Sequence, residues 1–160
     1  MIYERSSGVT QKKQSEARKD WTVTTILLEN LPVVIRKTPR PEWDRETVRR
    51  NTVYASGAVL ADPYGGIIYK KSRRQNYGKV ERELLMTLIM NRTMFCSREC
   101  LIGVINSVHE HRVADNTLNK HINNIRHSLE DGGRTYITTQ YASGYKWEVP
   151  VFKYYLDREG

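Results

Sequence analysis

The apolar residues between Asp115 and Asp131 most constrain the fold of this chain, because they recur with the period of an α-helix. The four residues follow spacings of four, three and four: Leu118, Ile122, Ile125 and Leu129. This stripe predicts an amphipathic helix that begins near Asp115 and buries one face. The sequence EDGGR then ends the helix, since Gly132 or Gly133 can adopt the left-handed conformation that caps a helix.

The segments on either side of this helix complete a pattern of sheet, helices and hairpin. The sequences TVYASGAVLAD and IIYKKSRR, separated by the turn PYGG, predict a small antiparallel sheet from Thr52 onward. Apolar residues at helical spacing in KVERELLMTLIMNR and SRECLIGVINSV predict two more helices, the second with Ser97 as N-cap. In TYITTQYASGYKWEV the period changes to two around Ser143 and Gly144, which predicts a β-hairpin.

We therefore expect an α+β fold with an N-terminal antiparallel sheet, three helices and a C-terminal β-hairpin. A length of 160 residues favours one domain with extensions. We assign residues 52–150 to that domain and residues 1–20 to a mobile polar tail. Residues 21–51 form an extension that supplies one or two strands and a connector able to become helical after Pro41, and residues 151–160 form a C-terminal tail.

The charge of the chain points to an anionic partner. Lys and Arg outnumber Asp and Glu by 26 to 18, a net charge of +8 that favours nucleic acid first and an anionic membrane surface second. The apolar runs are too short for a membrane span, and the N-terminus lacks the order of a signal peptide. We expect a cytoplasmic, nucleoid-associated protein.

The sequence gives little support for catalysis or for a cofactor. Cys96 and Cys100 are too few for a disulfide framework or a metal cage, and we interpret both as small core residues. His109 and His111 have no further His or Cys spaced to complete a metal site. No cluster of Ser, Cys or carboxylate side chains indicates a nucleophile, so we expect neither an enzyme nor a bound cofactor or metal.

The face of the helix opposite the apolar stripe has an unusual composition. Winding at 100° per residue places six side chains on this face: Asn116, Thr117, Lys120, Asn123, Asn124 and His127. Asn weakens a helix, yet its amide can bind an adenine edge through two hydrogen bonds, and Lys can reach guanine or phosphate. A solvated face without a partner is the alternative, and the helix alone leaves both interpretations open.

The order of these motifs resembles the winged-helix DNA-binding domain of OmpR/PhoB-type regulators, including the ToxR-like one-component branch. The resemblance covers about residues 52 to 150. ERELLMTLIMNRTMFCSRECLIGVIN is similar to the first helix, a short strand and the second helix of the family. DNTLNKHINNIRHSLED is similar to the family's recognition helix, and ITTQYASGYKW is similar to its wing.

The resemblance implies a transcriptional regulator that places the helix at 115–130 in the major groove and the wing at 135–149 on the DNA backbone or minor groove. The implied groove and phosphate residues are Asn116, Thr117, Lys120, His121, Asn123, Asn124 and Arg126, and the implied wing residues are Thr139 and Tyr141. The partners would be double-stranded promoter DNA, RNA polymerase through the loop 109–114, and a second copy or another regulator. The family usually has Arg where this chain has Asn116, Asn123, Asn124 and Tyr141, so we expect weaker phosphate attraction. A winged-helix module that binds another regulator or polymerase is the alternative function.

Overall fold

The computed structural model of the chain describes residues 23–92, 94–109, 115–130, 132–140 and 143–158. The tail predicted over residues 1–20 lies outside these ranges. The chain forms two compact units. The sheet unit comprises Met1–Gln75 with Phe152–Gly160, and the helical unit comprises Asn76–Val151.

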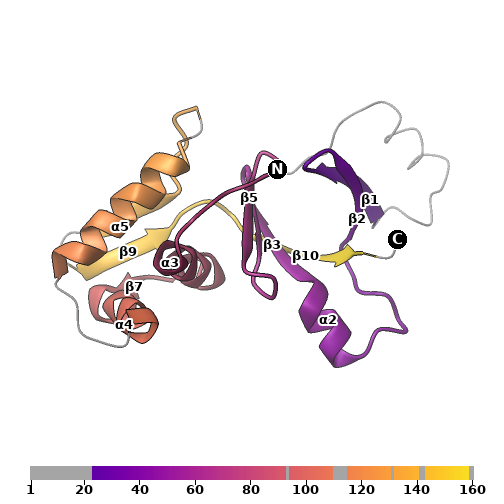
Figure 1. Cartoon of the computed structure of the whole chain (residues 1–160), viewed down its shortest axis with the longest axis horizontal. Coiled ribbons are helices and arrows are strands. Elements are labelled where there is room, and N and C mark those ends of the chain that lie inside the picture. The colour runs from indigo at the N-terminus through magenta and orange to yellow at the C-terminus, as the bar shows by residue number, and fades with distance from the viewer. Residues whose placement is uncertain (1–22, 93, 110–114, 131, 141–142, 159–160) are drawn as a thin grey trace. The chain divides into compact units, whose positions relative to one another are not determined.

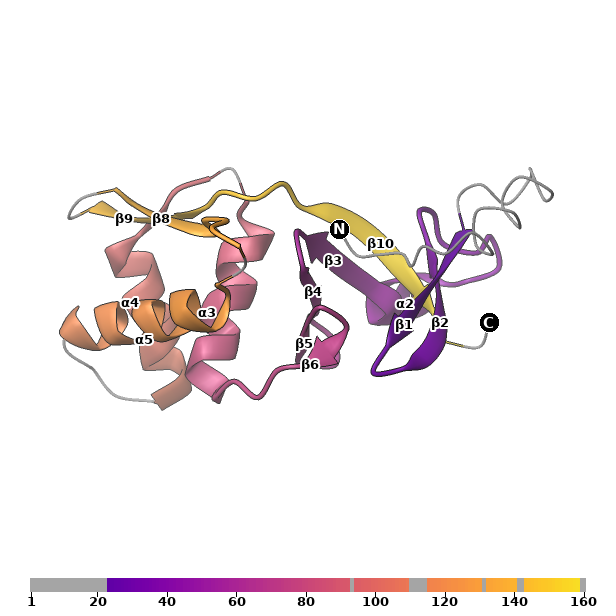
Figure 2. The same cartoon turned by 90° about the horizontal axis from the view of Figure 1, so that it is seen from above.

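Seven antiparallel strands make up the sheet unit (Figures 1 and 2). They are β1 (Val23–Leu28), β2 (Leu31–Arg36), β3 (Thr52–Ser56), β4 (Val59–Asp62), β5 (Ile67–Lys70), β6 (Arg73–Arg74) and β10 (Phe152–Asp157). Their spatial order is β1-β2-β10-β3-β4-β5-β6. The last strand of the chain therefore lies in the middle of a sheet that is otherwise built from the first 74 residues.

The position of β10 corrects the expectation of a C-terminal tail over residues 151–160. Leu156 pairs with Ile35 of β2, and Tyr154 pairs with Val53 of β3. Leu156 is 2% exposed and packs in the same core as Ile35 and Val53. Burial of this apolar side chain and pairing on both edges of the strand hold the segment in the sheet.

Residues 23–51 contain the strands and the helix that the sequence predicted for this segment. Two strands, β1 and β2, form from the first apolar run, and α2 (Arg45–Asn51) follows the proline-rich connector. Asp44 is the N-cap of α2, because its carboxylate accepts a hydrogen bond of 2.8 Å from the backbone N–H of Thr47. This hydrogen bond is the main cause that holds the pKa of Asp44 below its usual value.

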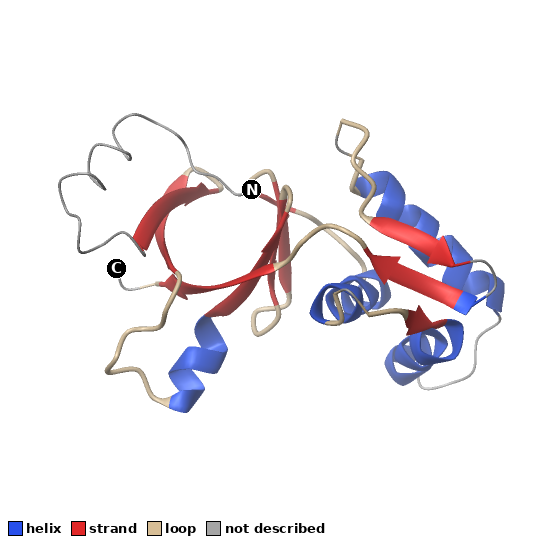
Figure 3. Cartoon of the chain, turned by 180° about the vertical axis from the view of Figure 1, so that it is seen from behind, coloured by secondary structure: helices blue, strands red, loops and turns tan. Residues whose placement is uncertain are grey.

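The two outermost hairpins of the curved sheet meet at their turns (Figure 3). Glu29 and Asn30 connect β1 to β2, and Lys71 and Ser72 connect β5 to β6; all four residues have positive φ, between 53° and 70°. Two consecutive residues with positive φ are the requirement of the two-residue turn that suits the twist of a β-hairpin. The N–H of Glu29 donates to the carbonyl of Ser72 over 2.7 Å, so the two turns are joined directly.

The helical unit contains the three predicted helices and the predicted hairpin. The helices are α3 (Lys79–Met90), α4 (Arg98–His109) and α5 (Asp115–Ser128), and the strands are β7 (Cys96–Ser97), β8 (Ile137–Gln140) and β9 (Gly144–Trp147). The small sheet has the order β7-β9-β8. Together with the N-terminal antiparallel sheet, these elements confirm the predicted α+β class.

The core of the helical unit follows the apolar stripes. The α5 stripe of Leu118, Ile122, Ile125 and Leu129 is at most 1% exposed. Gly132 and Gly133 both have positive φ after the helix, as predicted. Ser97 accepts a hydrogen bond of 3.1 Å from the backbone N–H of Cys100, as the predicted cap of α4.

One of the two predicted core cysteines is exposed. Cys96 is buried, but Cys100 lies on the exposed side of the first turn of α4. Phe95, which precedes β7, is 42% exposed. Among the described residues, none of the helices is sufficiently long and apolar to span a membrane.

Candidate nucleic-acid interface

The outer face of α5 is polar and accessible. Lys120, Asn123, Asn124 and His127 are exposed, Thr117 is half-buried, and the apolar stripe on the opposite side is buried. The helix therefore has the orientation that the sequence predicted. Asn116 lies in the first turn, but its side chain is outside the described part of the structure, as is Tyr141 and most of the loop 109–114.

Two of the predicted interface residues are held by a carboxylate on α3. One oxygen of Glu81 lies 3.0 Å from Nδ1 of His121 and accepts a hydrogen bond of 3.0 Å from the amide nitrogen of Asn124. His121 and Glu81 are 21% and 19% exposed. The contact fixes the orientation of both α5 side chains. One N–H and the oxygen of the Asn124 amide remain available, which is the pair of groups that an adenine edge requires.

Arg126 connects α5 to the wing. Its guanidinium donates to the carbonyl of Ile137 over 3.2 and 3.3 Å and to the hydroxyl of Thr139 over 2.5 Å, and both acceptors belong to β8. The same guanidinium lies 5.5 Å from the centre of the Tyr145 ring. All four contacts use the fixed planar geometry of the guanidinium group. Arg126 therefore has a positioning role that the sequence did not reveal.

A second connection, between α4, α5 and β9, was missed in the sequence. The Tyr145 hydroxyl donates to the side-chain oxygen of Asn119 over 2.8 Å, and Arg98 donates to the same oxygen over 3.0 Å. Asn119 lies one residue from Lys120, and nothing in its local pattern distinguishes it from a base-contacting asparagine. Its partners are 21 and 26 residues away, so only the folded chain shows its role.

The wing is shaped by a close approach at Gly144. A Cβ atom at this position would collide with the Cys96 carbonyl oxygen and would lie 2.9 Å from the Cα atom of Ser97. Only glycine permits β9 to pair with β7 here. Farther along the strand, the rings of Trp147 and Tyr136 pack with their centres 5.2 Å apart.

A groove of about 380 Å³ runs beside the C-terminal half of α5. Asn123, Arg126 and His127 line one side, and Arg134 with Thr135 lines the other. The last turn of α5 is also tied to the residues before α3, since the hydroxyls of Tyr77 and Ser128 are 2.5 Å apart. Burial raises the pKa of Tyr77 above its usual value.

Residues 73–147 match the family model described as "Transcriptional regulatory protein, C terminal". This range covers all of the helices and strands of the helical unit. Residues 73–147 form a winged-helix domain of the OmpR/PhoB type. The winged-helix domain is the DNA-binding domain of transcriptional regulators, a class that is not enzymatic.

Solved structures agree with this assignment. The DNA-binding domain of Escherichia coli CadC is 25% identical to the chain, with a TM-score of 0.55, and the match covers 64% of this chain and 97% of that one. The Thermotoga maritima response regulator DrrB, an OmpR/PhoB homologue, is 28% identical, with a TM-score of 0.53 and coverage of 60% and 44%. The chain thus spans less than half of DrrB.

A third structure, the C-terminal DNA-binding domain of RstA from Klebsiella pneumoniae, is similar in fold alone. It is 17% identical, with a TM-score of 0.53, and the match covers 72% of this chain and 96% of that one. No curated protein sequence matches the chain.

Proposed function

We propose that the chain is a sequence-specific regulator of transcription that reads promoter DNA with the exposed face of α5 in the major groove and with its wing on the DNA backbone or minor groove. The observation that carries the proposal is the composition of that face. Lys120, Asn123, Asn124 and His127 are exposed on a helix whose other side is fully buried. Short amide side chains on such a face match the hydrogen-bonding groups of base edges.

The contacts inside the domain divide the ten predicted interface residues by role. Asn123 and Lys120 would contact DNA directly, and Asn124 and His121 would do so in an orientation fixed by Glu81. Arg126 and Thr139 would act mainly by holding the wing against α5. The roles proposed for Asn116 and Thr117 rest on helical periodicity and on the family resemblance, that of His127 rests on periodicity and its exposure, and that of Tyr141 rests on the resemblance alone.

The remaining partners and the location belong to the same proposal. A regulator of this type would act on DNA in the cytoplasm, at the nucleoid. It would bind as a homodimer or with another regulator, because the few basic residues of α5 give limited phosphate attraction. The loop 109–114 would be the contact to RNA polymerase. We propose residues 52–150 as the segment that these activities require.

Selection of duplexes from a random pool by the full chain tests the proposal. We expect enrichment of one sequence, with an affinity at physiological salt that is orders of magnitude above that for scrambled DNA. An enriched pool that is bound no better than the starting pool would contradict sequence-specific binding.

A protein-interaction module is the second candidate, and one observation favours it. Met90, Met94 and Phe95 are exposed apolar residues at the end of α3 and before β7. Exposed apolar side chains that lie close together mark interaction surfaces. If replacement of Met94 and Phe95 by Ser abolished regulation in cells and left DNA affinity intact, the result would show that this surface binds a protein partner.

A further inference from the structure

The positive charge of the chain is concentrated in the sheet unit. Residues 23–75 with 152–158 contain 12 basic and 6 acidic residues, a surplus of +6. Residues 76–151, which contain the winged helix, have 9 basic and 8 acidic residues, a surplus of only +1. DNA-binding proteins obtain most of their non-specific affinity from cations that neutralise phosphates. The helical unit, which contains the helix that we assign to base recognition, has few cations in excess of its acidic residues for this purpose.

The six acidic residues among the described residues of the sheet unit each accept a hydrogen bond inside the unit. Four carboxylates bind arginine: Glu42, Glu46, Asp62 and Asp157. The other two, Glu29 and Asp44, accept backbone N–H groups.

Four basic residues of the sheet unit lie at the β5–β6 hairpin on either side of or within its two-residue turn: Lys70, Lys71, Arg73 and Arg74. Lys71, Arg73 and Arg74 are exposed. Among the described residues, neither the Arg73 nor the Arg74 guanidinium forms an ion pair. The three side chains line a pocket of about 650 Å³ together with Glu29, Asn30 and Ser72.

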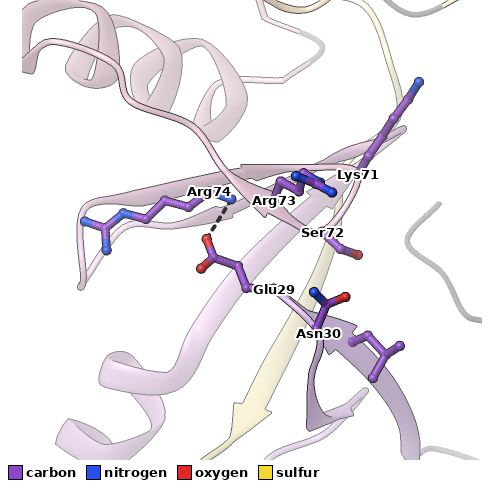
Figure 4. Close-up of a pocket in the computed structure, with 7 residues that line it drawn as sticks. Glu29, Asn30, Lys71, Ser72, Arg73 and Arg74 are labelled. Atoms are coloured by element: carbon purple, nitrogen blue, oxygen red, sulfur yellow. Dashed lines mark hydrogen bonds between the residues drawn. The ribbon is translucent and has the colours of Figure 1, made fainter.

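The hairpin is held in place by the neighbouring turn. Glu29 donates its N–H to the carbonyl of Ser72 over 2.7 Å, and its carboxylate accepts the N–H of Arg74 over 2.9 Å (Figure 4). Glu29, the carboxylate among the described residues that line the pocket, is thus bound to the backbone of the hairpin. Four positions with positive φ, none of them glycine, make up the two turns. Such conformations persist only where the surrounding contacts determine them, so the cations project from a fixed frame.

The directions of the side chains indicate the kind of anion. In Figure 4, Lys71 and Arg74 leave the hairpin in opposite directions, and Arg73 lies between them. A single small phosphate would need cations that converge on one point. Diverging cations on a fixed hairpin match a row of phosphates, such as the backbone of duplex DNA.

We propose that the β5–β6 hairpin, with Arg73 and Arg74 at its centre, is a second DNA-binding surface of this chain that binds backbone phosphates independently of base sequence. The inference rests on the proposed function, because it assigns phosphate contacts to the DNA that the winged helix reads. It also explains how a winged-helix domain with a surplus of +1 can bind a polyanion. Residues 23–72 of the sheet unit lie outside the range matched by the family model, whereas Arg73 and Arg74 are its first two residues.

The test is the salt dependence of DNA affinity for the full chain and two matched double variants. Arg73→Gln with Arg74→Gln removes two charges from the hairpin. Lys37→Gln with Arg45→Gln removes two charges from exposed positions of the same unit, outside the hairpin. Each neutralised phosphate contributes about 0.9 to the slope of log affinity against log salt.

We expect the hairpin variant to lower the slope by up to about two units, on preferred and scrambled DNA alike, and the control variant to leave it unchanged. Equal slopes for the hairpin variant and the parent would overturn the inference, as would equal losses in both variants, which would indicate net charge rather than a site. Tight binding of inorganic tripolyphosphate by the parent and not by the hairpin variant, with unchanged DNA slopes, would also overturn it in favour of a small-anion site. Failure of the parent to bind any duplex would instead contradict the proposed function. Melting curves confirm that both variants fold.

Discussion

The carboxylate of Glu81 on α3 accepts a hydrogen bond of 3.0 Å from the side-chain amide of Asn124 on α5. The same oxygen lies 3.0 Å from Nδ1 of His121, so one acidic residue orients two side chains of the face that we assign to DNA. We predict that Glu81→Ala lowers affinity for the preferred DNA sequence about tenfold, which corresponds to ~1.4 kcal/mol. Affinity for scrambled DNA should change much less, because phosphate contacts do not depend on the orientation of Asn124.

Glu83→Ala is the matched control for this experiment. Glu83 lies on the same helix, is exposed, and its replacement removes the same charge. We expect Glu83→Ala to affect both kinds of DNA equally. If the two variants have the same ratio of specific to scrambled affinity, Glu81 has no role in orienting Asn124 for base contact.

Arg126 and Lys120 should differ in what they contribute. Arg126 donates to Ile137 and Thr139 in the wing, so Arg126→Ala should lower stability by about 1–2 kcal/mol and leave the salt slope nearly unchanged. Lys120 is exposed, so Lys120→Ala should leave stability unchanged and lower the slope by about 0.9. Thermal melting and a salt titration of DNA affinity measure the two effects. The reverse pattern would show that Arg126, and not Lys120, meets phosphate.

Gly144 should be the least replaceable glycine of the wing. Gly144→Ala forces a Cβ atom against the backbone of Cys96 and Ser97, so we expect a loss of stability of more than 2 kcal/mol or loss of the β7–β9 pairing. Gly132→Ala is the control, because it also has positive φ but has no atom within 4 Å of the added Cβ. Gly132→Ala should lower the free energy of unfolding by only about 1–2 kcal/mol, the cost of placing a non-glycine residue in the left-handed conformation. Similar melting temperatures for the two variants would contradict the close approach.

The two cysteines should react at different rates in the folded chain. Cys100 is exposed, whereas Cys96 is buried, and burial raises the pKa of the Cys96 thiol, so less thiolate is present at any given pH. Mass spectrometry after brief treatment with iodoacetamide at pH 8 should show one modified cysteine, Cys100, and two after denaturation. Modification of Cys96 at a comparable rate in the native chain would mean that β7 opens readily.

The sequence was sufficient for elements whose signal is local. The stripes of α3 and α5, the cap at Ser97 and the change of period at the hairpin depend on neighbouring residues, and all of them predicted the observed structure. The contribution of β10 could not be predicted in this way, because the pairs Leu156–Ile35 and Tyr154–Val53 join residues more than 100 positions apart. The concentration of positive charge in the sheet unit could not be predicted either, because that unit combines the first 75 residues with β10 at the other end of the sequence.

The candidate DNA interface could be predicted only in part, for the same reason. The exposed face of α5 follows from helical period, so Lys120, Asn123 and Asn124 were placed correctly. The partners of Asn119, Arg126 and His121 lie on other elements, and side chains that look equivalent in the sequence differ in what they contact. The identity of an asparagine therefore does not distinguish a base contact from an internal brace.

Asn123 tests the central claim most directly, because it is exposed in the middle of the α5 face and its hydrogen bond within the described part of the chain, to Arg126, is long at 3.5 Å. The measurement is the affinity of Asn123→Ala for the best DNA site and for scrambled DNA at one fixed salt concentration. We predict a loss of ~1–3 kcal/mol confined to the best site, with unchanged or slightly higher stability, since Ala favours helix. Equal losses on both DNAs, or no loss on either, would contradict base recognition by α5 and favour the protein-interaction function.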